Sequence, residues 1–243
     1  MSTSGLTIVF DNYPFKPGLT SLWGFAAVIH LSELTILFDT GSNGRVLLRN
    51  MDMLGLDPGA VDMLFLSHAH WDHIGGLDSF LEINHTATVL VHEGFSTHLI
   101  QDLDTLCGKL IVVSGDIGKL APGIYSTGIL DDSPPEQAMV LETKDSTIVI
   151  GGCAHPGMEW IVQHVKSRLS KNVHLAVGGF HLMNGSKPSI EQSVACLRDL
   201  GVEYVLPTHC TGDTAKASFQ RAYGTHYLEG GIGYTIAFDH LGN

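Results

Sequence analysis

Short apolar runs recur along the whole chain, and polar and turn-forming residues separate them. In some runs apolar and polar residues alternate, whereas others are unbroken stretches of Val, Ile and Leu, as in strands that are buried on both faces. This pattern predicts strands over residues 6–10, 25–31, 35–39, 63–67, 88–92, 110–114, 124–127, 138–142, 147–151, 174–178, 204–207 and 234–238.

Apolar residues at helical spacing predict helices over residues 46–54, 158–169, 190–200 and 214–222. In the third of these the apolar residues form a stripe, and Ser189 is expected to cap its N-terminus. Many strands with only a few helices favour two packed sheets with helices outside them over one doubly wound sheet. The length of 243 residues fits one domain spanning residues 1–243.

The composition limits the classes of protein to which this chain could belong. Apolar residues make up 44% of the chain and charged residues 16%, enough for a sizeable core. The formal net charge of -12 excludes a non-specific nucleic-acid binder, which needs a basic face. The N-terminal segment has no basic stretch followed by an apolar one, and the apolar runs are too short to span a bilayer. We therefore expect a cytoplasmic protein with no membrane or nucleic-acid partner; its oligomeric state is left open.

The cysteines are widely spaced and form no CxxC pair; they are Cys107, Cys153, Cys196 and Cys210. This spacing is not typical of a disulfide framework or of a structural zinc knuckle. Cys153 and Cys210 lie next to histidines in the sequence, but we interpret both as small buried hydrophobic residues.

Histidine, the commonest metal ligand, occurs 14 times, against 13 lysines and arginines together. Several histidines and one aspartate directly follow predicted strands; they are Asp39, His68, His155, His181 and His209. Strand ends in α/β proteins are where ligands and catalytic groups gather, because the strand fixes the backbone while the following loop shapes a site.

The run 67-SHAHWDHIGG-76 carries the strongest chemical signal. His68 and His70 are two residues apart, so an extended backbone directs both imidazoles to the same side. Asp72 and His73 follow where the chain turns into a helix. Two nitrogen donors beside an oxygen and nitrogen pair suit two adjacent metal ions. The alternative interpretation is a set of caps and surface polar residues at a helix N-terminus.

The HxHxDH pattern after an apolar strand resembles the signature of the metallo-β-lactamase superfamily. The segment 36-ILFDTG-41 resembles its first motif, in which an aspartate, here Asp39, orients a metal ligand. The segments 151-GGCAHPG-157 and 207-PTHCTG-212 resemble its third and last histidine motifs. The resemblance implies a four-layer αββα sandwich of two mixed β-sheets flanked by helices. It also implies two divalent transition-metal ions, zinc above all, with iron or manganese as alternatives. The implied ligands are His68, His70 and His155 for one ion and Asp72, His73 and His209 for the other.

A narrower resemblance covers nearly the whole chain. The segments WGFAAVI, FDTGSNG, EQAMVLETK, GCAHPG, GGFHL and THCTG are similar to the subfamily named for 7,8-dihydropterin-6-methyl-4-(β-D-ribofuranosyl)aminobenzene-5′-phosphate synthase. Where the superfamily usually has a bridging aspartate, this chain has His181, as that subfamily does. The stretch from His92 to Glu136 is short for the subfamily, which argues against a closed pocket for a large substrate.

Three functions follow as expectations. The first is a hydrolase in which two ions activate water against an ester, lactone, thioester or phosphodiester. The second is a transferase that uses the same ions to activate a diphosphate leaving group, and the third is a non-catalytic metal-binding module. We expect catalytic roles for Asp72, His181 and Asp39, and a small-molecule substrate that is phosphorylated or pterin-like. Asp131 and Asp132 are expected in a solvated loop that could contact substrate.

Overall fold

The computed structural model describes residues 4–130 and 133–242, so Asp131 and Asp132 lie outside the described residues. The chain forms two compact units. Unit 1 comprises Met1–Ser114 and Gly231–His240, and unit 2 comprises Gly115–Gly230 and Leu241–Asn243. The single domain expected from the length stays a prediction. Among the described residues, no helix has the length and apolar character needed to cross a membrane.

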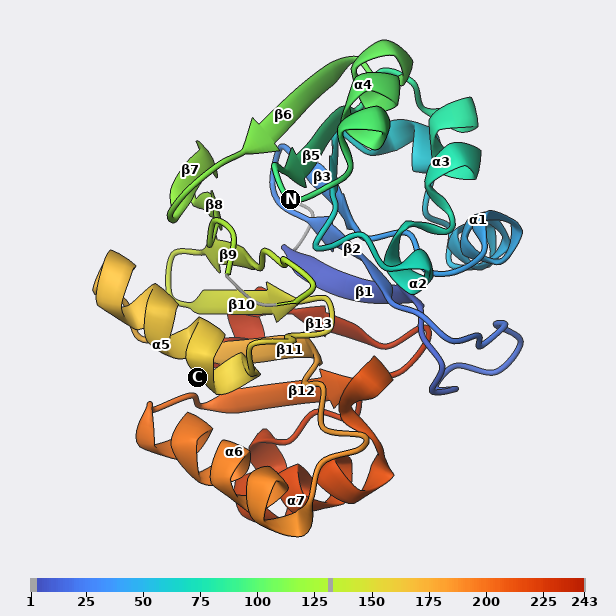
Figure 1. The fold of residues 1–243 in the computed structure, drawn as a ribbon. Coiled ribbons are helices and arrows are strands. Elements are labelled where there is room, and N and C mark those ends of the chain that lie inside the picture. The colour runs from blue at the N-terminus through green and yellow to red at the C-terminus, as the bar shows by residue number, and fades with distance from the viewer. Residues whose placement is uncertain (1–3, 131–132, 243) are drawn as a thin grey trace. The chain divides into compact units, whose positions relative to one another are not determined.

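Unit 1 is built on a seven-stranded mixed sheet in the order β13-β1-β2-β3-β4-β5-β6 (Figure 1). Strands β3 to β6 run parallel to one another, and the remaining neighbours are antiparallel. The strands are Gly5–Phe10 (β1), Ala26–His30 (β2), Thr35–Phe38 (β3), Met63–Phe65 (β4), Thr88–His92 (β5), Lys109–Val113 (β6) and Thr235–Ala237 (β13). The helices are Gly44–Met53 (α1), Trp71–Ile74 (α2), Leu77–Ile83 (α3) and Thr97–Leu106 (α4).

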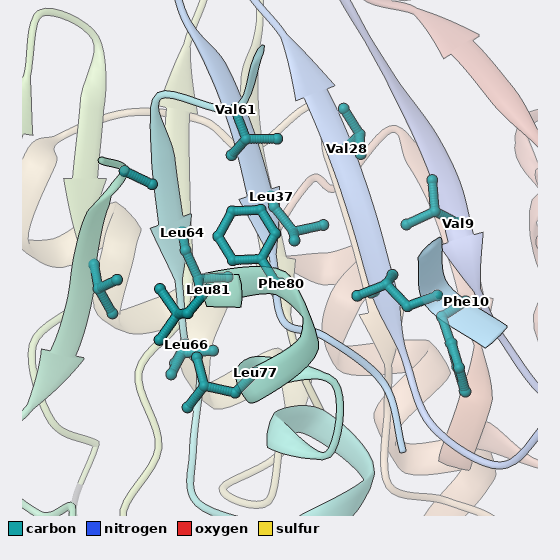
Figure 2. Packing of buried hydrophobic residues seen from close by; sticks show 14 of the residues in the cluster. Val9, Phe10, Val28, Leu37, Val61, Leu64, Leu66, Leu77, Phe80 and Leu81 are labelled. Atoms are coloured by element: carbon teal, nitrogen blue, oxygen red, sulfur yellow. The ribbon is translucent and has the colours of Figure 1, made fainter. Parts of the chain in front are cut away.

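An apolar core joins the helices of unit 1 to one face of its sheet. Phe80 of α3 is fully buried and lies against strand residues that include Leu37 and Leu64 (Figure 2). Residues on the other face, such as Ile36 and Phe65, are buried as well. Burial on both faces explains why these strands are continuous apolar runs in the sequence.

Unit 2 is built on a six-stranded mixed sheet in the order β12-β11-β10-β9-β8-β7. Its strands are Gly118–Ala121 (β7), Ile124–Ser126 (β8), Met139–Glu142 (β9), Thr147–Gly151 (β10), Leu175–Gly179 (β11) and Tyr204–Thr208 (β12). Its helices are Met158–Leu169 (α5), Lys187–Asp199 (α6) and Asp213–Tyr223 (α7). The chain also has 3-10 turns at Pro58–Ala60 (η1), His209–Thr211 (η2), Gly224–His226 (η3) and Phe238–Gly242 (η4).

Strands β10, β11 and β12 are parallel neighbours, so their C-terminal ends lie at the same edge of the sheet of unit 2 (Figure 1). At this edge β11 ends in a glycine pair. Gly178 has a φ of +115°, and a Cβ there would overlap the carbonyl oxygen of Gly151 on β10. A Cβ on Gly179 would collide with the sulfur of Cys210. The loops after these strands can approach one another only because both positions lack a side chain.

The two mixed sheets with flanking helices confirm the α/β class. All the predicted strands are present, although several end earlier, as at Phe38 and Phe65. Helices α3 and α4 and strand β7 were not predicted. One cap was predicted wrongly: α6 begins at Lys187, and Ser186 rather than Ser189 caps it by accepting a hydrogen bond from the Ser189 backbone N–H. A proline in the first turn, which needs no N–H donor there, lets the helix start earlier.

Candidate metal centre

The HxHxDH run leaves β4 in extended conformation and enters the short helix α2, as the sequence predicted. Backbone hydrogen bonds fix α2 in unit 1. The Thr40 N–H donates to the carbonyl of His73 at 2.7 Å, and the Phe25 N–H donates to the carbonyl of Asp72 at 3.2 Å. The backbone that carries the side chains of Asp72 and His73 is therefore attached to the sheet of unit 1.

Asp39 lies directly after β3 and is fully buried. One carboxylate oxygen accepts the Ser67 backbone N–H at 2.7 Å. The other accepts the Ser67 hydroxyl at 2.7 Å and lies 2.7 Å from Nδ1 of His73. A carboxylate accepts only, so Nδ1 of His73 carries the proton and the ring's lone pair is on Nε2. This is the tautomer that a histidine needs to bind a metal ion through Nε2.

Ser67 extends the effect of Asp39 to a second imidazole. Its hydroxyl lies 2.9 Å from Nδ1 of His68. Since the single hydroxyl proton is donated to Asp39, the oxygen accepts the proton on Nδ1 of His68, which again places the lone pair on Nε2. The buried carboxylate of Asp39 thus fixes the tautomer of two imidazole rings, those of His73 and His68. No role was predicted for Ser67.

The remaining members of the run lie around these rings. The ring centroid of His68 is 4.2 Å from that of His73 and 4.7 Å from that of His70. Asp72 is 6% exposed, with a carboxylate oxygen 3.8 Å from Nε2 of His73. His70 is exposed. Unit 1 therefore gathers the predicted residues Asp39, His68, His70, Asp72 and His73.

The other predicted site residues lie in unit 2, at the shared edge of its parallel strands. His155 follows β10, His181 follows β11 and His209 follows β12. The ring centroids of His155 and His181 are 4.5 Å apart. His209 is fully buried, His155 is largely buried and His181 is exposed. The prediction that strand ends collect these histidines holds within this unit.

Glu136 fixes the tautomer of His155 in the same way that Asp39 fixes that of His73. Its buried carboxylate accepts the backbone N–H groups of Cys153, Ala154 and His155 at 2.9 to 3.0 Å. It also lies 2.7 Å from Nδ1 of His155, so that Nε2 of this ring has the lone pair. This role of Glu136 was not predicted, because the EQA segment was noted only as part of a resemblance.

Two cysteines lie among the histidines of unit 2, and both are buried as expected. Potential ligand atoms of Cys153, His155 and His181 lie within 4.8 Å of one another. The same holds for Cys153, His209 and Cys210. A hydrogen bond with the Cys153 side chain, opposed by burial, holds the pKa of the Cys210 thiol well below its ordinary value.

Backbone strain marks the same positions. Positive φ values at residues other than glycine occur, within the described part of the chain, at Asp39, Ala154, Ser170, His181 and His209. Each such conformation costs about 1–3 kcal/mol and persists only where surrounding structure imposes it. Three of these five are predicted site residues and a fourth precedes His155, which is the distribution expected of a functional site.

The chemistry of the donors fits metal ions. Nδ1 of His73 in unit 1 and of His155 in unit 2 is hydrogen-bonded to a buried carboxylate, and Nδ1 of His68 to the serine that Asp39 orients. Metal-binding histidines usually have such partners. Nitrogen donors with a carboxylate oxygen suit zinc, iron or manganese better than calcium or magnesium.

Known proteins with similar structures or sequences agree with this chemistry. A crystal structure described as a metal-dependent hydrolase of the β-lactamase superfamily is 25% identical and has a TM-score of 0.81, covering 96% of this chain and 98% of that one. The metallo-beta-lactamase fold protein YhfI from Bacillus subtilis is 16% identical, with a TM-score of 0.71 over 97% of this chain and 100% of that one. These likenesses confirm the predicted fold.

A curated relative carries the name of the predicted subfamily. The 7,8-dihydropterin-6-methyl-4-(beta-D-ribofuranosyl)-aminobenzene-5'-phosphate synthase of Methanocaldococcus jannaschii is 29% identical, and the match covers 84% of each chain. The family profile of the metallo-beta-lactamase superfamily matches residues 24–209. Because this match spans both the HxHxDH run and the final histidine motif, the chain belongs to the metallo-beta-lactamase superfamily.

Proposed function

We propose that this chain is a metal-dependent hydrolase with a dinuclear centre. The observation that carries the proposal is the pair of buried carboxylates, Asp39 and Glu136, each hydrogen-bonded to Nδ1 of a predicted ligand. Burying a carboxylate is costly unless it is fully hydrogen-bonded, and here both also hold the proton of a histidine on Nδ1, which leaves the lone pair on Nε2. The ions are proposed to be zinc, with iron or manganese as alternatives. Their ligands are His68, His70 and His155 for one ion and Asp72, His73 and His209 for the other.

Two bound ions would supply Lewis acidity, lowering the pKa of water toward neutrality and stabilising negative charge that develops in the reaction. The chain's own residues divide the remaining work. Asp72 serves as a ligand and accepts the proton of the attacking water. His181, exposed beside His155, donates a hydrogen bond to a substrate oxygen. Asp39 keeps His73 and, through Ser67, His68 in the ligating tautomer.

The substrate is proposed to be a small ester, lactone, thioester or phosphodiester. Support comes from the similar crystal structure that is described as a metal-dependent hydrolase. A second candidate is favoured by the relative named as a synthase. In that reaction the ions would activate a diphosphate leaving group on a dihydropterin, and a carbon of the aminobenzene ribotide would be the acceptor in place of water.

The metal content tests the centre itself. We expect the purified chain to bind close to two transition-metal equivalents, and His68→Ala and Asp72→Ala to lower that number, because each removes a ligand. Elemental analysis after dialysis measures it, with His98→Ala, an exposed histidine on α4, as the matched control. Undiminished metal in both ligand variants would contradict the proposed ligand set.

The buried carboxylates should act on metal affinity without touching the ions. Asp39→Asn and Glu136→Gln are each expected to weaken metal binding by ~10–100-fold, the usual effect of losing such a partner. Competition with a chelating dye measures the affinity. Asp62→Asn, which replaces a carboxylate that accepts the Thr35 backbone N–H, is the control and should leave the affinity unchanged. Affinities within twofold of the unmodified chain would show that neither carboxylate has this role.

A substrate panel separates hydrolysis from transfer. We expect an aryl ester, a γ-lactone, a thioester or an aryl phosphodiester to be hydrolysed at ~1 s⁻¹ or faster, a typical enzyme rate. The rate should vanish in metal-stripped protein and return when metal is added. Condensation of a dihydropterin diphosphate with the aminobenzene ribotide, with none of the panel hydrolysed, would instead establish the transferase.

His181 should affect turnover more than metal content. On the substrate that the panel identifies, His181→Ala is expected to lower kcat by ~100-fold or more, the scale for a lost donor to a developing charge. At least one metal equivalent should remain. His226→Ala, which removes a ring stacked on Tyr204 in the same unit, serves as the control. Unchanged kcat in His181→Ala would reduce this histidine to a packing role.

A further inference from the structure

Cys153 belongs to two groups of potential ligands in unit 2, whereas its neighbours His155, His181, His209 and Cys210 belong to one each within this unit. Its ligand atom, the sulfur, lies within 4.8 Å of donor atoms of His155 and His181, and also within 4.8 Å of those of His209 and Cys210. The side chain is 4% exposed. A small buried hydrophobic residue would need none of these neighbours.

The backbone at Cys153 is fixed by the same carboxylate that fixes the backbone at His155, two residues later. The Cys153 N–H donates to Glu136 at 3.0 Å, and the His155 N–H donates to the same carboxylate at 2.9 Å. Between them Ala154 has a φ of +53°. This left-handed residue turns the chain so that the thiol and the imidazole converge, and Glu136 stabilises the turn.

The separations are compatible with ligands of a common ion. Zinc binds thiolate sulfur at about 2.3 Å and imidazole nitrogen at about 2.0–2.1 Å, so two ligands of one tetrahedral ion lie roughly 3.5 Å apart. The ligand atoms in each of the two groups lie within 4.8 Å of one another, which is wider than that spacing by about 1 Å at most. In the proposed function His155 binds one ion and His209 binds the other. The sulfur of Cys153 lies within 4.8 Å of a donor atom of each of these histidines.

We propose that Cys153 is a metal ligand, and that its thiolate sulfur is shared by the ion bound to His155 and the ion bound to His209. The inference rests on the proposed dinuclear centre and adds a sulfur ligand to it. A neutral imidazole has one lone pair and binds one ion, whereas a thiolate sulfur has lone pairs for two. When the metal–sulfur bonds form, the thiol proton passes to solvent, and no electrons are transferred. Such a ligand would favour zinc or another thiophilic ion over manganese.

Cys210 is the appropriate comparison because it is equally buried but differently placed. It belongs to only one of the two groups, its sulfur fills the space left by Gly179, and it donates a hydrogen bond to the Cys153 carbonyl at 3.5 Å. These contacts give the Cys210 sulfur partners other than a shared ion. Substituting it therefore removes a neighbouring thiol without removing the proposed ligand.

Cobalt provides the first test. Full-length protein stripped of metal and loaded with two equivalents of Co²⁺ should show an intense near-ultraviolet band from thiolate-to-cobalt charge transfer. We expect Cys153→Ala and Cys153→Ser to lose the band and to bind cobalt more weakly, beyond the ~10–100-fold effect of losing an indirect partner. Cys210→Ala should keep it. A band that persists in both Cys153 variants, or disappears only in Cys210→Ala, would overturn the proposal.

Cadmium tests the shared position on the unmodified chain and so does not depend on a variant that folds. With two equivalents of ¹¹³Cd²⁺, a shared thiolate should move both cadmium resonances downfield of the range for nitrogen and oxygen ligands. One displaced resonance would overturn the shared position, and none would overturn the ligand itself.

The outcomes also separate this inference from the proposed function. Two bound ions with the spectra of nitrogen and oxygen ligands alone would leave the dinuclear centre standing and refute the role of Cys153. A chain that binds neither cobalt nor cadmium would refute both.

Discussion

A buried carboxylate hydrogen-bonded to an imidazole is the interaction on which the arrangement of histidines in each unit depends. Asp39 to His73 and Glu136 to His155 are both 2.7 Å bonds in environments closed to water. An ionised carboxylate in such a place would be strongly destabilising without partners, so each also accepts backbone N–H groups from the loop that carries the histidine or its neighbour. The same bonds therefore stabilise the loop and choose the ring nitrogen that can bind a metal ion.

Parallel strands explain how the histidines of unit 2 come together. Strands β10, β11 and β12 begin at one edge of the sheet and end at the other, so three residues far apart in sequence follow three adjacent strand ends. Backbone strain at Ala154, His181 and His209 then aims the loops away from the regular strand direction. The packed apolar sheet below supplies the stability that tolerates this strain.

Much of this arrangement could be predicted from the sequence. Continuous apolar runs identified the strands, and the spacing of His68, His70, Asp72 and His73 predicted that these side chains gather, as they do in unit 1. Helix α3 was missed because its seven residues make less than two full turns of periodic pattern, and α4 was missed because it buries Leu103 alone among its ten residues. Ser67 and Glu136 were missed because their roles depend on partners up to 28 residues away, and no local pattern records a hydrogen bond formed only by folding. Ser186 rather than Ser189 caps α6 because the helix begins at Lys187, with a proline in its first turn that needs no N–H donor.

The glycine pair at the end of β11 limits how the chemistry of this region can diversify. Because Gly178 and Gly179 leave no room for a side chain, neither position can acquire a new contact for a different substrate without moving β10 or Cys210. The loop beyond His181 is free of that restriction, and Met183 in it is 42% exposed. Substitutions are therefore accommodated more easily in the loop after His181 than in the strand that precedes it.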